Sequence, residues 1–464
     1  MLSPGALANV VAVRLYSSAA HRLAYRSPVM GGGRYGVVFC GGGPAAIGIV
    51  VCAAADGRLD ELLSRGVCII EAGPAIGPGA LGHQPISANT RGVTFLRALE
   101  TARAQSALDA VGDDPSTLAL ARQRNVFPRL PLVGRHLESL GRAVHAMVEA
   151  SPGCAVLTRH AVREVRLLAG GGVSVAAGHV DGAPTITAAA DHAVIAMGGT
   201  PRGLTDLRLL PGLGLGAYPD KLCHAADLLD DRIGLPPRLR RAVADRRAAV
   251  VIGGSHSAWS AAWMLVHDPE LRDAHGRPPT VTVLHRSPLR FFFWSTARAR
   301  AAGYAFDETR DVCPRTGMVH RHGGLRADAH ALAWAATRNG GQGPLRAIAL
   351  VDEPRARAAA EQALDEAGAI IAGIGYLPNL PTLRWPDGSP LRLASDDNGA
   401  LVTERARLLS DDGTVLPELL GLGLGAGLPA SGALAGEPAY AGRLDSVRLY
   451  QAEVGRIVLD SLLS

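Results

Sequence analysis

Two apolar runs, each followed by a glycine-rich turn and a helical pattern, stand out along the chain. The first run covers residues 35–40 and ends at Gly41, and a helix is predicted from about Ala45 through Ala55. A second apolar strand is predicted over 66–73. Short strands that are apolar throughout are typical of a parallel sheet covered on both faces, so the pattern predicts a strand–helix–strand unit here.

The period of the pattern then changes twice. Helices are predicted near residues 94–111 and 133–150, and the second has apolar positions at helical spacing. Short strands separated by glycine-rich turns follow between residues 154 and 189. They lead into a further strand within 192–201, which again ends in a glycine turn.

A second strand–turn–helix pattern begins far downstream, at residues 247–266, and its next strand is predicted over 280–286. Later come a strand and glycine turn within 368–379, a glycine-rich tail over 419–436 and a final helix from 444 to 463. Two such units predict an α/β fold with two Rossmann-like domains, the second inserted into the first.

The composition limits the possible classes of protein. Hydrophobic residues make up 48% of the 464 residues and charged residues 19%, which is typical of a folded globular chain. No apolar run approaches the roughly 20 residues of a membrane helix. The net charge of +5 is modest and the arginines are scattered, so neither a membrane nor a nucleic acid is expected as a partner.

The six cysteines form no CxxC pair and no zinc spacing. This favours a reducing compartment, taken here as the cytoplasm, and argues against a dithiol reductase. Residues 1–34 contain Arg14, Arg22, Arg26 and Arg34 but no acidic residue, and we interpret them as a leader or unstructured extension. The alternative is a mitochondrial transit peptide, which would change the predicted location.

The first glycine turn, Gly41-Gly42-Gly43-Pro44-Ala45-Ala46, fits the pattern G-x-G-x-x-A. Gly41 permits the turn, Gly43 leaves no side chain between backbone and pyrophosphate, and Ala46 lets helix and strand pack closely. The helix that Pro44 and Ala45 open offers N–H groups to phosphates. Glu71, at the end of the next strand, can accept hydrogen bonds from ribose hydroxyls and would repel a 2′-phosphate, which favours FAD or NAD over NADP.

The second turn, Gly253-Gly254-Ser255-His256-Ser257-Ala258, has serine in place of the second glycine. Ser255 is small enough for close approach, and its hydroxyl could itself bind a phosphate. The next strand ends in Arg286, whose guanidinium could bind a 2′-phosphate, so we predict NADPH here. NADH, and a solvated role for Arg286, are the alternatives.

These residues resemble a known family, the two-dinucleotide-binding-domain flavoproteins and especially the NADPH-dependent flavin monooxygenases of the N-hydroxylating type. Residues 37–46 with Glu71 resemble the FAD fingerprint, and 250–258 resemble the NADPH turn. Residues 372–379, which include Gly375, resemble the A-T-G-Y-x-P-N segment of this family, and 196–201 resemble the segment where the chain leaves the FAD domain.

The resemblance implies cofactors, domains and a reaction. It implies FAD bound by residues 35–215 together with 385–464, and NADPH bound by the inserted residues 216–384. NADPH would reduce FAD, which would then activate O2 to hydroxylate a small amine or amino acid. An NAD(P)H-dependent flavin reductase or oxidase, and a flavin-binding scaffold or sensor without turnover, are the alternatives. The partners expected are the small-molecule substrate and O2, and the chain could form a homo-oligomer.

Two features of the family are absent. The chain lacks the Baeyer–Villiger signature F-x-G-x-x-x-H-x-x-x-W, and its tail lacks the Gly-Asp pair that many such flavoproteins place near the ribitol of FAD. Ketone oxygenation is therefore not favoured, and the contact of the tail with the flavin is not predicted.

Catalytic candidates lie in residues 81–92, where members of this family place groups beside the flavin ring. Gln84 and Asn89 could donate hydrogen bonds there, or Asn89 could serve as a helix cap. His256 is interpreted as a phosphate contact or a surface residue. The aromatic segment 289–299 is interpreted as a substrate wall or, alternatively, as core, and the histidines of 318–324 have no partner with metal-ligand spacing, so no metal is predicted.

Overall fold

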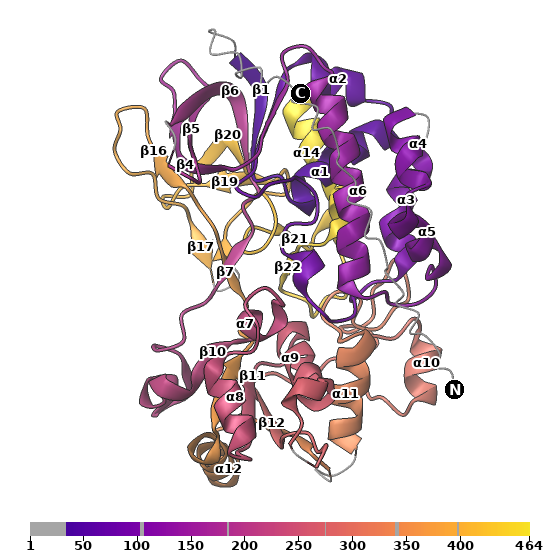
Figure 1. Ribbon diagram of the computed structural model, residues 1–464, viewed down its shortest axis with the longest axis vertical. Helices are drawn as coiled ribbons and strands as arrows, with labels where there is room; N and C mark the ends of the chain where they lie inside the picture. The colour runs from indigo at the N-terminus through magenta and orange to yellow at the C-terminus, as the bar shows by residue number, and fades with distance from the viewer. Residues whose placement is uncertain (1–33, 103–105, 183–184, 274, 339–342, 397–398) are drawn as a thin grey trace, which may run out of the picture. The chain divides into compact units, whose positions relative to one another are not determined.

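The computed structural model describes residues 34–464 apart from 103–105, 183–184, 274, 339–342 and 397–398 (Figure 1). The predicted leader therefore lies outside the described residues, except Arg34, which begins the first strand. Within this part the α/β class is confirmed, because two sheets with parallel strands carry helices between their strands.

The larger sheet contains the first predicted unit. Its nine strands in the described part are β1 Arg34–Cys40, β2 Val67–Ile70, β3 Ala155–Leu157, β4 His160–Leu167, β5 Val173–His179, β6 Ile186–Ile195, β16 Thr382–Arg384, β19 Arg407–Leu409 and β20 Val415–Gly421. Strands β3, β2, β1, β6 and β20 lie next to each other in that order and are parallel, whereas β4 and β5 form an antiparallel extension from β6. The chain leaves β1 through a helix to β2 and returns on the other side of β1 as β6, so a topological switch point lies at Cys40.

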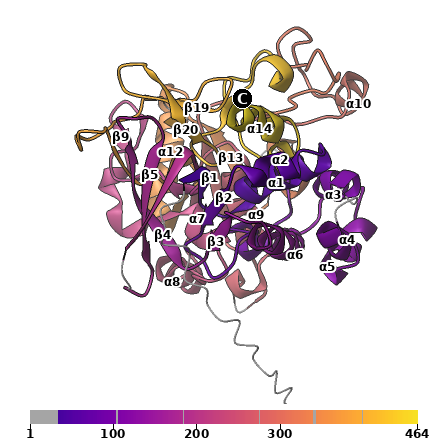
Figure 2. The same cartoon turned by 90° about the horizontal axis from the view of Figure 1, so that it is seen from above.

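Helices cover this sheet. They are α1 Pro44–Ala55, α2 Leu59–Ser64, α3 Gly92–Ala102, α4 Ser106–Gly112, α5 Pro115–Arg122, α6 Leu130–Glu149, α13 Val447–Tyr450 and α14 Glu453–Leu463. Helix α1 is almost entirely buried because α3, α6, α13 and α14 surround it. The C-terminal α14 therefore lies beside α1, at the start of the chain, while β4 and β5 lie on the side away from α3 to α5 (Figures 1 and 2).

The smaller sheet contains the second predicted unit. Its strands are β10 Leu222–His224, β11 Ala249–Ile252, β12 Val281–His285, β13 Leu345–Ala349 and β14 Ala369–Ala372. Its helices are α7 Ala225–Leu229, α8 Pro237–Ala244, α9 His256–His267, α10 Thr296–Ala301, α11 Ala327–Arg338 and α12 Pro354–Glu366. All pairs in the order β10-β14-β11-β12-β13 are parallel, and β11 lies at the switch point.

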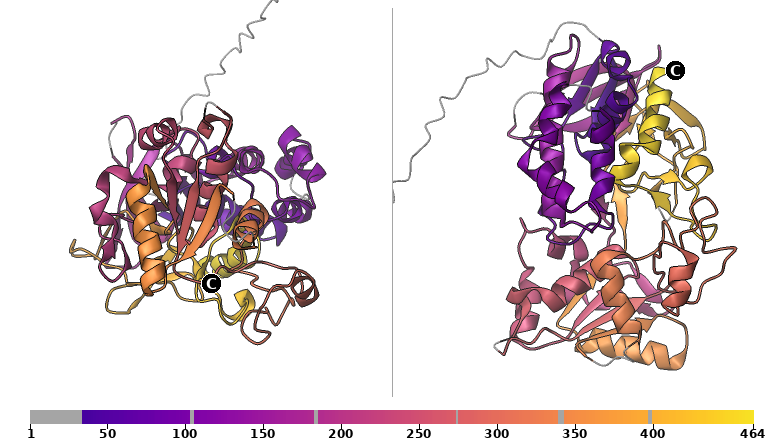
Figure 3. Two further views of the ribbon diagram at one scale, coloured as in Figure 1. Left: turned by 90° about the horizontal axis from the view of Figure 1, so that it is seen from below. Right: turned by 90° about the vertical axis from the view of Figure 1, so that its right-hand side faces the viewer.

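Both faces of the smaller sheet are covered, as a doubly wound fold requires. Val251 of β11 packs in one apolar cluster with residues of α9 and α11, whereas Val250 and Ile252 pack in a second cluster with residues of α12. Figure 3 shows α12 as an orange helix beside the strands of this sheet. The sheet, with the edge formed by the carboxyl ends of its strands, therefore lies between two helical layers.

Short strand pairs complete the described part. They are β7 Gly199–Pro201 with β15 Tyr376–Pro378, β8 Arg208–Leu210 with β9 Leu213–Gly214, β17 Ser395–Asp396 with β18 Gly399–Ala400, and β21 Leu428–Pro429 with β22 Arg443–Leu444. The β7–β15 pair joins the segments by which the chain passes from the larger sheet to the smaller one and back.

Four predicted elements differ from the structure. The predicted helix 94–111 consists of α3 and α4, and the strands expected near 185–189 and 192–201 are one continuous strand, β6. The predicted helix 444–463 is wrong: the backbone leaves the helical region at Ala452, and α13 and α14 are separate. The break lets Tyr450 pack on α1 at Gly48, where an added Cβ would lie 2.7 Å from the Cβ of Tyr450.

No helix in the described ranges combines the length and the apolar composition that a membrane crossing needs.

Candidate functional site

The first glycine turn begins at the carboxyl end of β1, and its two end glycines have different surroundings. Gly41 has φ +105°, and a Cβ there would overlap the carbonyl oxygen of Ala196, just after β6. The protein itself therefore requires glycine at this position.

Gly43 is the residue before α1, with an ordinary φ of −73°. A Cβ added at Gly43 would meet no atom of the described chain within 4 Å. No side chain caps the start of α1, which Pro44 begins, so its first N–H groups are available to an anion. A glycine that no neighbouring protein atom requires, directly before an uncapped helix, fits a site where a pyrophosphate approaches the backbone.

The small residues after the turn are buried. Ala45 has 6% of its surface exposed and Ala46 none, and both lie in the apolar core. A larger side chain at either position would push α1 away from the sheet and move the turn.

Glu71 lies beside the turn. One carboxylate oxygen accepts a hydrogen bond from the Gly42 N–H at 2.7 Å, and the other accepts from the Gly73 N–H, also at 2.7 Å. These bonds hold the acid where the first and second parallel strands end, which is where a nucleotide ribose lies in this fold class. The predicted residues of the first turn and Glu71 are thus brought together.

The second glycine turn repeats this geometry at β11. Gly253 has φ +131°, and a Cβ there would overlap the carbonyl oxygen of Gly373, so its glycine is structural. Ser255 is exposed and is the residue before α9, and its hydroxyl makes no capping hydrogen bond. Ser257, in the first turn of α9, is partly buried. The start of this helix is therefore as open to an anion as that of α1.

Arg286 follows β12 and is exposed. The neighbouring His285 is buried and its Nδ1 donates to the Ser287 carbonyl oxygen at 2.9 Å, which fixes the turn that Arg286 belongs to. Gly375 has φ +91° and accepts a hydrogen bond from the Arg202 N–H at 3.3 Å. Because Gly373 touches Gly253, the segment with Gly375 lies next to the second turn.

His256 has a role that neither interpretation of the sequence included. Its Nε2 accepts a hydrogen bond from the backbone N–H of Arg326 at 3.0 Å. Burial, with the nearby Arg326 as a further cause, lowers the pKa of His256 to about 4. The imidazole is therefore neutral near pH 7 and ties α9 to the segment before α11, so a charged contact with a phosphate is not supported.

Gln84 and Asn89 lie in the loop between β2 and α3. Gln84 is partly buried after a short 3₁₀ turn, Leu81–His83, and Asn89 is exposed. Helix α3 begins at Gly92, so the residue directly before it is Arg91 and not Asn89. The Asn89 carbonyl oxygen accepts a hydrogen bond from Nη1 of Arg326 at 3.4 Å, which connects this loop to the segment before α11.

The aromatic segment 289–299 divides into two parts. Phe291 and Phe293 pack with Tyr304 and Trp334, which is core packing. Trp294 instead stacks with Arg91, and Phe292 stacks with Arg326. Sequence reasoning missed both arginines, because each is only one of many scattered arginines until the fold brings it to an aromatic ring.

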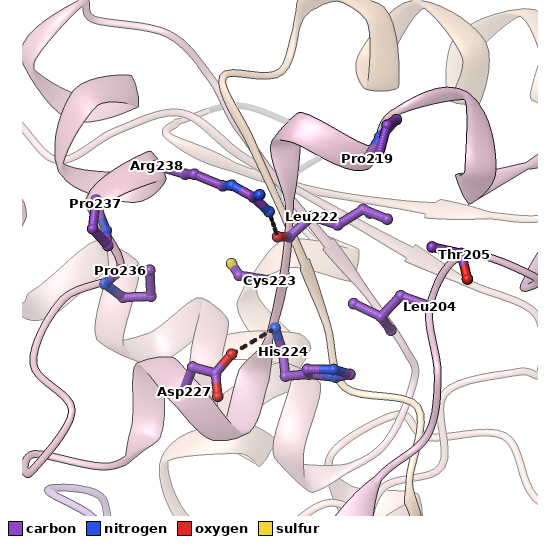
Figure 4. A pocket seen from close by; sticks show the side chains of 10 residues that line it. All are labelled: Leu204, Thr205, Pro219, Leu222, Cys223, His224, Asp227, Pro236, Pro237 and Arg238. Atoms are coloured by element: carbon purple, nitrogen blue, oxygen red, sulfur yellow. Dashed lines mark hydrogen bonds between the residues drawn. The ribbon is translucent and has the colours of Figure 1, made fainter.

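A cavity of about 500 Å³ lies at the edge of the smaller sheet, next to β10, α7 and α8 (Figure 4). In it, Asp227 accepts a hydrogen bond from the His224 N–H at 3.3 Å, and Arg238 donates to the Leu222 carbonyl oxygen. No residue predicted for FAD or NADPH lines it. Both glycine turns are therefore outside this cavity.

The six cysteines are all free thiols. Among the residues described, no three histidine, cysteine, aspartate or glutamate side chains gather closely enough to hold a metal ion. His322, in the segment 318–324, uses its Nε2 in a hydrogen bond with the carbonyl oxygen of Leu434 at 3.1 Å.

Comparisons with known proteins give a consistent picture. The chain is 36% identical, over 442 residues, to the CMP-5′-(3-aminopropyl)phosphonate hydroxylase of Streptomyces rubellomurinus, covering 93% of this chain and 98% of that protein. No protein-family model matches it.

Solved structures with the same fold include two amino-acid hydroxylases and a diamine monooxygenase. The ornithine N-hydroxylase of Kutzneria sp. 744 has a TM-score of 0.54 at 15% identity, covering 92% of this chain and 99% of its own. The L-lysine 6-monooxygenase of Pseudomonas syringae has 0.54 at 16%, covering 92% and 99%. The FAD-bound cadaverine monooxygenase of Erwinia amylovora has 0.57 at 10%, covering 93% and 95%. These likenesses confirm the two-domain fold.

Proposed function

Because the chain belongs to the family of two-dinucleotide-binding-domain flavin monooxygenases that includes the Streptomyces hydroxylase, we propose that it hydroxylates the nitrogen of a small amine or amino acid. It is an oxidoreductase that depends on FAD and NADPH. FAD, when bound and reduced by NADPH, would activate O2, one atom of which goes to the amine and the other to water. The observation that carries the proposal is the opening at Gly43, where the protein leaves room for a group that it does not itself provide.

The larger sheet supplies the FAD site in this proposal. Gly41, Gly43 and the buried Ala45 and Ala46 shape the turn, Pro44 begins the helix whose N–H groups face the pyrophosphate, and Glu71 holds the ribose. We place the FAD-binding part at residues 35–215 and 385–464.

The smaller sheet supplies the NADPH site, within residues 216–384. The turn at Gly253, Ser255 and Ser257 takes the pyrophosphate, Arg286 takes the 2′-phosphate, and Gly375 lets the chain pass close to the nicotinamide half. Because the β7–β15 pair connects the two parts, it is placed to align one cofactor with the other.

The proposal also covers the class of substrate, the location of the protein in the cell and its self-association. The Streptomyces hydroxylase is named for CMP-5′-(3-aminopropyl)phosphonate, which carries an aminopropyl group and so supports a primary amine here. Gln84 and Asn89 are proposed to face the reacting centre as hydrogen-bond donors. A cytoplasmic location and self-association remain predictions.

The Arg286→Ala substitution is expected to raise the KM for NADPH by about tenfold or more, because it removes a charge-assisted contact with the 2′-phosphate. The KM for NADH, which has no such phosphate, is expected to change little. Steady-state NAD(P)H oxidation measures both. Arg277→Ala, an exposed arginine at the other end of β12, is the control. Equal effects on the two nucleotides would remove Arg286 from the site.

The reaction itself is tested by incubating FAD-loaded protein with NADPH, ¹⁸O2 and a panel of primary amines that includes 3-aminopropylphosphonate, ornithine and cadaverine. A hydroxylamine product with one ¹⁸O atom, formed in proportion to NADPH consumed, is expected for at least one amine. NADPH consumption that yields only hydrogen peroxide, at a rate that no amine of the panel changes, would favour a flavin oxidase instead.

A further inference from the structure

Four side chains from three distant segments form one continuous stack. The guanidinium carbon of Arg91 lies 4.0 Å from the ring centre of Trp294. The ring centres of Trp294 and Phe292 are 4.8 Å apart at an angle of 82°. The guanidinium carbon of Arg326 lies 3.9 Å from the ring centre of Phe292. Each guanidinium is thus held against one of two aromatic rings, and the two rings contact each other edge to face.

The stack fixes the direction of each guanidinium. An arginine that lies over a ring face donates its N–H bonds sideways, in the plane of the guanidinium, and that plane matches the oxygens of an oxyanion. The aromatic rings also exclude water from part of each guanidinium. Any charged contact that the arginines make is therefore stronger.

No acidic side chain of the described residues forms an ion pair with either guanidinium. Arg326 donates to two carbonyl oxygens, those of Asn89 and Arg321, and the Nε of Arg91 is buried without a hydrogen-bond partner. Glu437 is the acid that acts on Arg326, but its carboxylate accepts hydrogen bonds from the N–H groups of His322 and Gly323. Burial lowers the pKa of Arg326 to about 10.

Such an arrangement is costly unless an anion joins it, since a partly buried charge with no counter-ion loses more hydration than it regains. Another arginine that stacks on a tryptophan offers a contrast. Arg338 also stacks on a tryptophan, Trp334, at 4.3 Å, but it lies on an exposed helix end, where water solvates the charge.

The position of the stack indicates which anion. Arg91 and Asn89 belong to the loop proposed to face the reacting centre, and the Arg326 backbone is bonded to His256 at the start of α9. The two charges therefore lie between the segment assigned to the flavin and the segment assigned to NADPH, whereas the 2′-phosphate is assigned to Arg286, after β12.

We propose that Arg91 and Arg326, held on Trp294 and Phe292, form a subsite for the phosphonate or phosphate group of an acidic amine substrate. The inference rests on the proposed function and specifies its substrate class. In this proposal the guanidinium N–H groups donate to the oxygens of the tetrahedral anion, while the amine of the same molecule reaches the flavin.

Binding measurements test the subsite without requiring turnover. Titration calorimetry on FAD-loaded protein would compare 3-aminopropylphosphonate with its diethyl ester, which keeps the amine and removes the charge. The wild type is expected to bind the phosphonate at least about tenfold more tightly than the ester. Arg91→Ala and Arg326→Ala are each expected to remove most of this preference and to leave the affinity for the ester unchanged.

Arg91→Lys keeps the charge but not the planar donor set, so it should recover only part of the preference. Arg338→Ala is the matched control and should not alter it. The FAD content of each variant reports whether it is folded. Equal binding of phosphonate and ester by the wild type would overturn the subsite.

A second measurement separates the substrate from NADPH. The rate of anaerobic flavin reduction as a function of NADPH concentration is expected to be the same in Arg91→Ala as in the wild type. A higher NADPH requirement with unchanged phosphonate binding would assign the stack to a nucleotide phosphate and overturn the proposal. If phosphonate binding depends on Arg91 but no amine is hydroxylated, the subsite stands and the proposed reaction fails.

Discussion

The Gly43→Val substitution is expected to give a folded protein that does not retain FAD. A Cβ added at Gly43 meets no described protein atom within 4 Å, and φ there is −73°, so we expect valine to be tolerated by the turn and its packing. The same side chain would occupy the space through which the pyrophosphate reaches the start of α1. The absorption spectrum of the purified protein and its FAD-to-protein ratio measure retention, and circular dichroism measures folding.

Two other glycines make this test specific. Gly170 is also free of neighbours and has an ordinary backbone conformation, so Gly170→Val should keep its full FAD content. Gly41→Ala should destabilise the protein itself, because φ is +105° and the Cβ would overlap the Ala196 carbonyl. Gly43→Val protein that is purified with stoichiometric FAD would refute the placement of the pyrophosphate.

Both glycine turns could be predicted from the sequence because their signals are local. In each, an apolar strand ends in glycine and a helix follows within three positions, and the structure gives both Gly41 and Gly253 a positive φ. The order of the elements along the chain was enough to give two Rossmann-like units, since a strand–helix–strand connection has one favoured geometry.

The end of the chain could not be predicted in the same way. Apolar spacing from 444 to 463 is compatible with one helix, and local propensity does not favour a break at Ala452. The break depends on contact with α1, where Gly48 accepts the Tyr450 side chain and Cys52 lies next to Gly455. Tertiary packing therefore divides into two helices a segment that the local apolar pattern predicts as one.

The two arginines of the proposed subsite could not be predicted from the sequence either. Arg91 and Trp294 are far apart in sequence, and neither belongs to a motif with a recognisable spacing. His256 was singled out for its place in the glycine turn, but its partner is the backbone of Arg326, which belongs to no pattern. A motif predicts where a cofactor backbone lies, whereas the side chains that select a substrate come from loops that only the fold brings together.

The Ser255→Phe substitution is expected to leave FAD in place and to slow flavin reduction by NADPH by about a hundredfold or more, because a large side chain at the start of α9 would exclude the pyrophosphate. Ser255 is exposed and its hydroxyl caps nothing, so the fold should tolerate the change. Anaerobic stopped-flow absorbance with NADPH measures the effect, and reduction by dithionite, which needs no nucleotide site, should proceed as in the wild type.

The conservative Ser255→Ala variant separates size from hydrogen bonding at the same position. If the role of Ser255 is to leave the helix N–H groups accessible, alanine preserves that role. Flavin reduction should then slow by only a few-fold, which is the effect expected from losing one hydrogen bond of the hydroxyl. If alanine and phenylalanine were equally damaging, the hydroxyl itself would be the phosphate ligand and the helix start a minor contributor. Rapid reduction of Ser255→Phe by NADPH would mean that the nucleotide does not bind at this turn, and the assignment of the smaller sheet to NADPH would fall with it.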